Sequence, residues 1–183
     1  MLSQRPMSVD DDFIEDHLTC YKETQGVLPK RLASFGDAYH EQGFLTQEQL
    51  YDIAYESSTR SAYHVKKNPK KRCKTVTRIV YGLEDDFSRA ALLTCLKGFK
   101  APTASCVLAA QRPGHDAVVD TRVWASLDRL DYLDGRKESF DADDYVTMID
   151  LIRRIADKTG WRPVDVGYAL FAYDDKVREG TLH

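Results

Sequence analysis

Asp120 is the charged residue whose setting most suggests chemistry, because it lies in the largely apolar run AVVDTRVW at residues 117–124. Burying a carboxylate among apolar neighbours costs free energy unless the group is paired or takes part in a reaction. A structural role is available, since an aspartate directly before Thr121 can cap a following helix and stabilise it by about 1 kcal/mol. A carboxylate fixed in a water-poor pocket can also stabilise positive charge or deprotonate a water molecule. The two roles are compatible in one residue.

A basic run between His64 and Arg78 is the second feature that indicates chemistry. It contains seven lysines and arginines and no acidic residue. One interpretation is a solvated loop without a role in binding. The other is a surface that follows a phosphate backbone, because such contacts dominate the affinity of proteins for nucleic acids. We favour the second interpretation, and the six residues expected to bind DNA in this run are Lys66, Lys67, Lys70, Lys71, Arg72 and Lys74.

Two helices joined by a tight turn are expected to position these groups, at about residues 90–111. Gly98 supplies the backbone freedom that a sharp reversal needs. Pro102 suits the first turn of the second helix, where its missing N–H would be unpaired anyway. The free N–H groups at such a helix start attract anions such as phosphate, and Lys97 and Lys100 add positive charge nearby.

The hairpin and the Asp120 segment together resemble a known family. Leu96-Lys97-Gly98-Phe99, followed by Thr103-Ala104, resembles the helix-hairpin-helix of the HhH-GPD superfamily of DNA glycosylases, in which Leu-Pro-Gly-apolar-Gly precedes Thr-Ala. The segment from Val119 to Val123 is similar to that family's Val-Asp-Thr-His-Val, and the stretch from Asp120 to Trp124 is also similar to the 8-oxoguanine glycosylase branch. The spacing between the two parts also fits. The resemblance covers roughly residues 88–130.

This resemblance implies that Asp120 is the catalytic carboxylate and that the partner is double-stranded DNA with a flipped-out base. It also implies that Lys97, Gly98, Lys100 and Thr103 hold the DNA backbone, and that a monovalent cation can bind the carbonyl groups of the hairpin. Two positions depart from the family pattern. Lys100 replaces the second hairpin glycine, and Pro102 occupies the position of the Schiff-base lysine, so we expect a monofunctional enzyme without β-lyase activity.

Length and composition set limits on the remaining possibilities. We expect the 183 residues to form one domain, with one or two helical lobes, around a core supported by 43% hydrophobic residues. The net charge of −3 argues mildly against a dedicated nucleic-acid binder. The four cysteines lack metal-ligand spacing, so we expect no metal centre and no iron–sulfur cluster. No signal peptide or membrane span is evident, which favours a protein of the cytoplasm or nucleoid, or of a eukaryotic nucleus. We expect the protein to be a monomer.

Apolar residues recurring at helical spacing predict an all-α fold. The predicted helices, after a loose segment at residues 1–9, cover residues 10–22, 28–42, 57–67, 84–96, 101–111, 141–158 and 163–173. A capping box at Thr46 starts another helix. Residues 75–83 are rich in β-branched side chains, but we predict a short helix or turn there because no second strand-like run offers a partner.

The function that these observations favour is a DNA N-glycosylase of the base-excision-repair type, which removes a damaged or modified base. Two non-catalytic alternatives stay open. One is a helix-hairpin-helix module that binds DNA without excising a base. The other is a protein-interaction domain whose basic surface contacts an acidic partner. The acidic isoelectric point of about 6.0 and the missing second hairpin glycine keep both alternatives open.

Overall fold

A computed structural model describes residues 8–178, and within that range the chain is helical without β-strands. This confirms the predicted all-α class. The elements in chain order are α1 (Asp11–Gln25), α2 (Val27–Gln42), α3 (Gln47–Ser57), the 3-10 helix η1 (Ala62–Lys67), α4 (Lys70–Gly82), α5 (Asp86–Leu93), α6 (Ala101–Gln111), α7 (Thr121–Arg129), α8 (Ala142–Thr159) and α9 (Pro163–Val177). None of the helices in this range is both long and apolar enough to cross a membrane.

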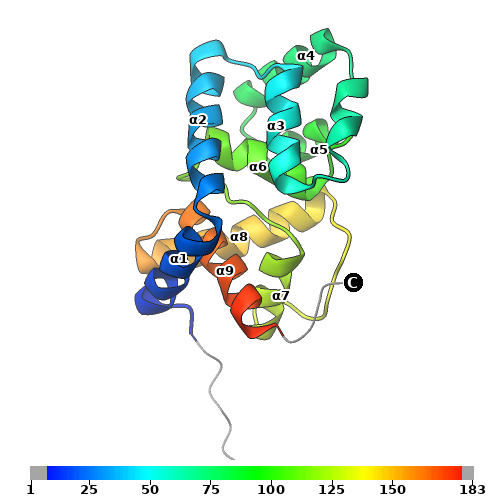
Figure 1. Cartoon of the computed structure of the whole chain (residues 1–183). Coiled ribbons are helices and arrows are strands. Elements are labelled where there is room, and N and C mark those ends of the chain that lie inside the picture. The colour runs from blue at the N-terminus through cyan, green and yellow to red at the C-terminus, as the bar shows by residue number, and fades with distance from the viewer. Residues whose placement is uncertain (1–7, 179–183) are drawn as a thin grey trace, which may run out of the picture.

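The helices lie in two groups that meet along α6 and α8 (Figure 1). In the first group, α2 and α3 pack on α6, and α4 and α5 complete the layer. In the second, α9 is packed between α1, α7 and α8. Helix α8 also contacts α5 and α6, so it joins the second group to the first. The connection from α6 to α7 passes between the groups and carries Asp120.

Most local predictions agree with these bounds. Thr46 forms the predicted capping box with Gln49, and Gly160 ends α8 with a left-handed backbone. The segment 75–83 is helical as predicted, but its helix α4 begins earlier, at Lys70. The predicted helix at residues 57–67 is wrong in its first half, because the chain turns after Ser57 and only η1 is helical there. Of the expected loose segment 1–9, residues 1–7 lie outside the described part of the chain.

Helices α5 and α6 form the predicted hairpin, with Gly98 in the turn at φ +87°. Few residues with a side chain adopt this backbone conformation. The space around Gly98 is also filled, because a Cβ atom there would lie 2.9 Å from Cγ2 of Val65 and 3.0 Å from its backbone nitrogen. The glycine therefore allows the turn to pack directly on η1, in addition to allowing the reversal.

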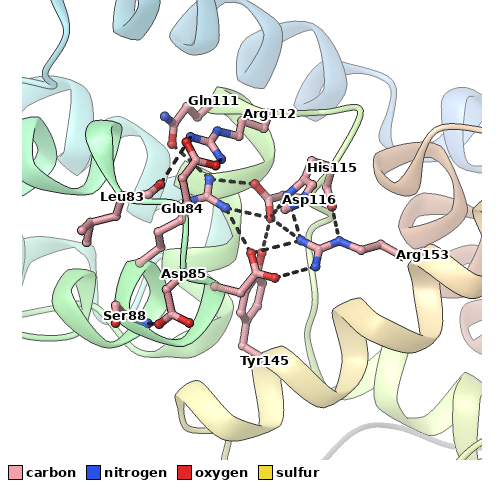
Figure 2. A network of polar contacts seen from close by, with 12 residues as sticks. Leu83, Glu84, Asp85, Ser88, Gln111, Arg112, His115, Asp116, Tyr145 and Arg153 are labelled. Carbon is pink, nitrogen blue, oxygen red and sulfur yellow. Dashed lines mark hydrogen bonds and ion pairs between the residues drawn. The ribbon is translucent and has the colours of Figure 1, made fainter.

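A buried ionic network ties the two groups together (Figure 2). Arg89 of α5 and Asp116 are both fully buried, and Arg89 donates to both carboxylate oxygens, at 3.2 and 2.8 Å. The hydroxyl of Tyr145 donates to the same carboxylate at 2.7 Å, and Arg153 of α8 approaches it at 3.4 Å. Arg153 also pairs with Asp86 at the start of α5. A buried charge needs such partners, because leaving one unpaired is costly.

Candidate functional site

A pocket of about 720 Å³ lies where the hairpin faces the start of α7. Four segments line it, at residues 57–64, 98–103, 120–121 and 138–140. The structure thus brings Gly98, Lys100 and Thr103 together with Asp120, although the two parts belong to different groups of helices. Lys97 is exposed and lies in the same turn, but it does not line the pocket.

Asp120 is the N-cap of α7 and is half-buried at the pocket wall. The backbone N–H groups of Arg122 and Val123 both donate to its Oδ1 atom, each at 2.9 Å. Among residues 8–178, no group donates a hydrogen bond to Oδ2. One oxygen therefore fixes the carboxylate to the helix start, and the other is left without a hydrogen-bond donor from the described residues. The capping role and the chemical role proposed from the sequence are both available to this side chain.

Burial raises the pKa of Asp120 above its ordinary value of 3.8, and the hydrogen bonds from Val123 and Arg122 oppose this shift. Desolvation disfavours the charged form of a carboxyl group, which is the usual cause of a raised pKa. Arg122 also lowers the pKa, whereas the carboxylate of Asp174 raises it. A carboxylate that is poorly solvated in this way is a better proton acceptor than one in water.

The side chain of Thr103 is mostly buried in the wall, where its hydroxyl lies 3.2 Å from that of Ser57. Lys100 is exposed at the mouth of the pocket and is the N-cap residue of α6, without a side-chain capping bond. Pro102 lies in the first turn of α6, as its ring favours. Of the hairpin residues predicted to bind DNA, Lys97 and Lys100 therefore present charged groups outward, and Thr103 contacts Ser57.

Asn68 holds the turn of the hairpin through contacts that sequence reasoning missed. Its side chain accepts a hydrogen bond from the backbone N–H of Lys97 and donates one to the carbonyl of Lys97, both at 2.9 Å. Asn68 itself is almost fully buried, just before the basic helix α4. This clasp fixes the turn of the hairpin to the basic segment. A lone asparagine before a proline carries no sequence signal for such a long-range contact.

The predicted basic surface begins on η1 and continues over the first turns of α4, rather than forming a loop. Lys66 lies over the ring of Tyr51 and Lys74 over that of Phe44, which holds both chains at the surface. Lys70 forms an ion pair with Glu48 at 2.6 Å, so part of its charge is neutralised. Lys71 and Arg72 are exposed, and no acidic partner lies within ion-pair distance among the described residues.

His64 is a second residue that the sequence did not single out, and it lines the pocket from η1. His115 lies five residues before Asp120 in sequence but belongs to the ionic network, where its Nδ1 atom lies 2.8 Å from Arg153. Ligand atoms of Asp86, His115 and Asp116 lie within 4.8 Å of one another, as in some metal sites. The carboxylates there already accept bonds from Arg89 and Arg153, so this cluster is explained without an ion.

Comparisons with models of known protein families, with curated proteins and with solved structures gave no significant match for this chain. A functional assignment therefore depends on the pocket, on Asp120 and on the motif residues between 88 and 130.

Proposed function

We propose that this protein binds double-stranded DNA and acts as a monofunctional DNA N-glycosylase. The observation that carries the proposal is the pocket that Asp120 shares with the hairpin residues Gly98 and Lys100. An enzyme that acts on a base in a duplex must turn the nucleotide out into a pocket. A glycine turn and a helix start beside that pocket would hold the phosphates of the displaced nucleotide.

Hydrolysis in this pocket would break the bond between C1′ of the sugar and the nitrogen of the base. Positive charge develops on the sugar as the base departs, and the Oδ2 atom of Asp120 accepts no hydrogen bond from residues 8–178. The carboxylate can stabilise that charge and accept a proton from the water whose oxygen bonds to C1′. The departing base takes up a proton, and the product is an abasic site.

Pro102 predicts the form of the product. A glycosylase that also cleaves the strand does so through an amine that forms an imine with the sugar. Proline within the chain has no such amine. The hairpin lysine closest to Pro102 in sequence is Lys100. We therefore propose an intact abasic strand as the product, without a covalent intermediate.

A screen of duplexes that each contain one modified base tests the proposal. Base release under single-turnover conditions is measured with and without alkali, which cleaves abasic sites, and borohydride is added in parallel to trap any imine. The expected result is cleavage that depends on alkali and no trapped adduct. A trapped adduct that disappears in Lys100→Ala would contradict the monofunctional mechanism.

The same screen distinguishes the alternatives. Tight binding to duplexes without release of any base would support a non-excising hairpin module. Absence of binding to every duplex would favour the protein-interaction domain, with the basic surface on η1 and α4 as its contact area.

A further inference from the structure

His64 occupies a defined position at the wall of the pocket. It comes from η1, which packs under the turn of the hairpin through Val65 and Gly98. Its ring lies against that of Tyr63, with centroids 3.9 Å apart. The side chain is half-buried and is one of those that line the pocket. Neither the cap of α7 nor the ionic network around Asp116 involves this residue.

The neighbour of His64 determines which ring nitrogen carries hydrogen. The Nζ atom of Lys67 lies 3.2 Å from Nδ1 of His64, and Lys67 also lies over the ring of Tyr63. A lysine ammonium group donates hydrogen bonds and cannot accept them. Nδ1 is therefore the acceptor, and the hydrogen of the neutral ring is on Nε2. His64 is thus prepared to donate a hydrogen bond through Nε2.

The remaining walls of the pocket are polar, and Asp120, Glu138 and Lys100 are the charged residues among them. Six residues contribute hydroxyl groups: Ser57, Ser58, Ser61, Thr103, Thr121 and Ser139. The two phenylalanines that line the pocket, Phe99 and Phe140, are mostly buried elsewhere and expose little ring surface. A site for a cationic alkylated base would use open aromatic faces, which attract positive charge. Hydroxyl groups and one N–H donor instead suit a base with carbonyl oxygens.

We infer that His64 is a specificity-determining residue, which reads a hydrogen-bond acceptor of a neutral, carbonyl-bearing base through Nε2–H. This inference rests on the proposed function, since it assumes that the pocket receives an extruded base. His64 would discriminate between bases, because a site that is built to make a hydrogen bond rejects a base that cannot complete it. Lys67 would act through His64 by selecting the tautomer.

Nuclear magnetic resonance on the protein labelled with ¹⁵N at histidine tests the inference without requiring catalysis. Two-bond ¹H–¹⁵N spectra identify the tautomer of each ring, and His64→Gln assigns the signals by removing those of His64. We expect the Nε2–H tautomer in the free protein. Free uracil and hypoxanthine at millimolar concentration should shift the His64 signals, whereas 3-methyladenine should shift them far less.

Two variants of His64 then measure selectivity on duplexes with a single deoxyuridine, deoxyinosine or 3-methyladenine nucleotide, and a variant of Lys67 with a charge-matched control tests the tautomer. His64→Leu should lose about three- to tenfold in binding or base release for the carbonyl-bearing bases, the typical effect of one neutral hydrogen bond. His64→Gln keeps an N–H donor and should recover most of that loss. Lys67→Met should raise the share of His64 rings that carry hydrogen on Nδ1, whereas Lys66→Met removes the same charge from η1 and should leave that share unchanged.

The outcomes separate this inference from the proposed function. If free bases shift the His64 signals but no duplex releases a base, the proposed glycosylase activity is contradicted, and the inference that His64 binds the base is supported. If bases are released and His64→Leu has wild-type selectivity, the inference is overturned and the enzyme assignment stands. If neither free bases nor duplexes affect the His64 signals, or if the ring carries its hydrogen on Nδ1, the inference is also overturned.

Discussion

Asp116 and Asp120 lie on the same connection between α6 and α7, yet their surroundings are opposite. Asp116 is fully buried, and both of its oxygens accept bonds from Arg89, with Tyr145 and Arg153 as further partners. Asp120 is half-buried and holds two backbone N–H groups through Oδ1 alone. A carboxylate whose oxygens are all paired can stabilise a fold. One with an unpaired oxygen at a pocket can also react.

The comparison predicts that Asp116 matters most for stability. Asp116→Asn leaves Arg89 buried without its counter-charge and should cost about 3–5 kcal/mol of unfolding free energy. Chemical denaturation followed by circular dichroism measures this. Glu84→Gln is the control, because Glu84 is largely exposed in its pair with Arg112 and should cost less than about 1 kcal/mol. Equal effects of the two substitutions would show that the buried network is not what joins the helix groups.

Asp120→Asn should have the opposite effect: it should lower activity and leave stability nearly unchanged. Asparagine caps a helix about as well as aspartate, so the fold should be retained. The charge opposite the sugar is lost, and base release should fall by about 10²–10³, the effect of removing one preorganised electrostatic contact. Single-turnover kinetics on the best duplex from the screen, together with binding of the same duplex, measure it. A variant as fast as the wild type would remove Asp120 from the mechanism.

The pH dependence of stability sharpens the same contrast. Because burial raises the pKa of Asp120 in the folded state, the folded chain binds this proton more tightly than the unfolded chain does. Ionisation therefore lowers stability as pH rises from about the ordinary carboxyl value through the folded pKa. Asp120→Asn should be at least as stable as the wild type at neutral pH, and the difference should vanish at pH below about 3.8. If Asp120→Asn is instead less stable than the wild type at neutral pH, the ionised carboxylate stabilises the fold as the cap of α7.

A smaller effect is expected for the turn that forms one side of the pocket. Gly98→Ala and Gly135→Ala both place a side chain at positive φ, which costs about 1–2 kcal/mol. A Cβ atom at Gly135 would have no other atom within 4 Å, whereas one at Gly98 would meet Val65 and the carbonyl of Ser61. The excess loss of stability in Gly98→Ala therefore measures the packing of the hairpin on η1. Equal losses of stability in the two variants would mean that η1 and the turn can move apart to accept the side chain without a measurable loss of free energy.

The smallest effect concerns the basic surface. The double substitution of Lys71 and Arg72 by alanine should lower the slope of log affinity against log salt by about 1.8, or about 0.9 for each phosphate contact. Lys70→Ala should change the slope less, because Glu48 already pairs with Lys70. Titration of an undamaged duplex over a salt series provides the measurement. An unchanged slope in the double variant would place the DNA surface elsewhere.

Local signals made much of this fold predictable. The capping box at Thr46, the apolar face of residues 141–158 and the glycine turn at Gly98 are each encoded by neighbours in sequence. The boundaries of η1 were not, because its short turns depend on packing against α3 and the hairpin.

The long-range polar contacts could not be predicted from the sequence. Arg89 and Asp116 are ordinary charged residues in sequence, and nothing local indicates that both are fully buried as a pair. Asn68 has no signature for its clasp on Lys97, and His64 reaches the pocket only because η1 packs under the turn. Asp120 was singled out as an acidic residue in an apolar run, and its catalytic role was predicted mainly from the resemblance to a known family.

The pairing of α1 with α9 has a consequence for how the chain folds during synthesis. Tyr21 stacks on Tyr168 and Phe13 lies 5.2 Å from Tyr173 in ring centroids, while Trp161 bonds to Asp11, 150 residues away in sequence. The apolar face of α1 therefore leaves the ribosome long before its partner exists. The group of α2 to α6 can condense first, and α1 must wait for α9, exposed to chaperones or to a second nascent chain.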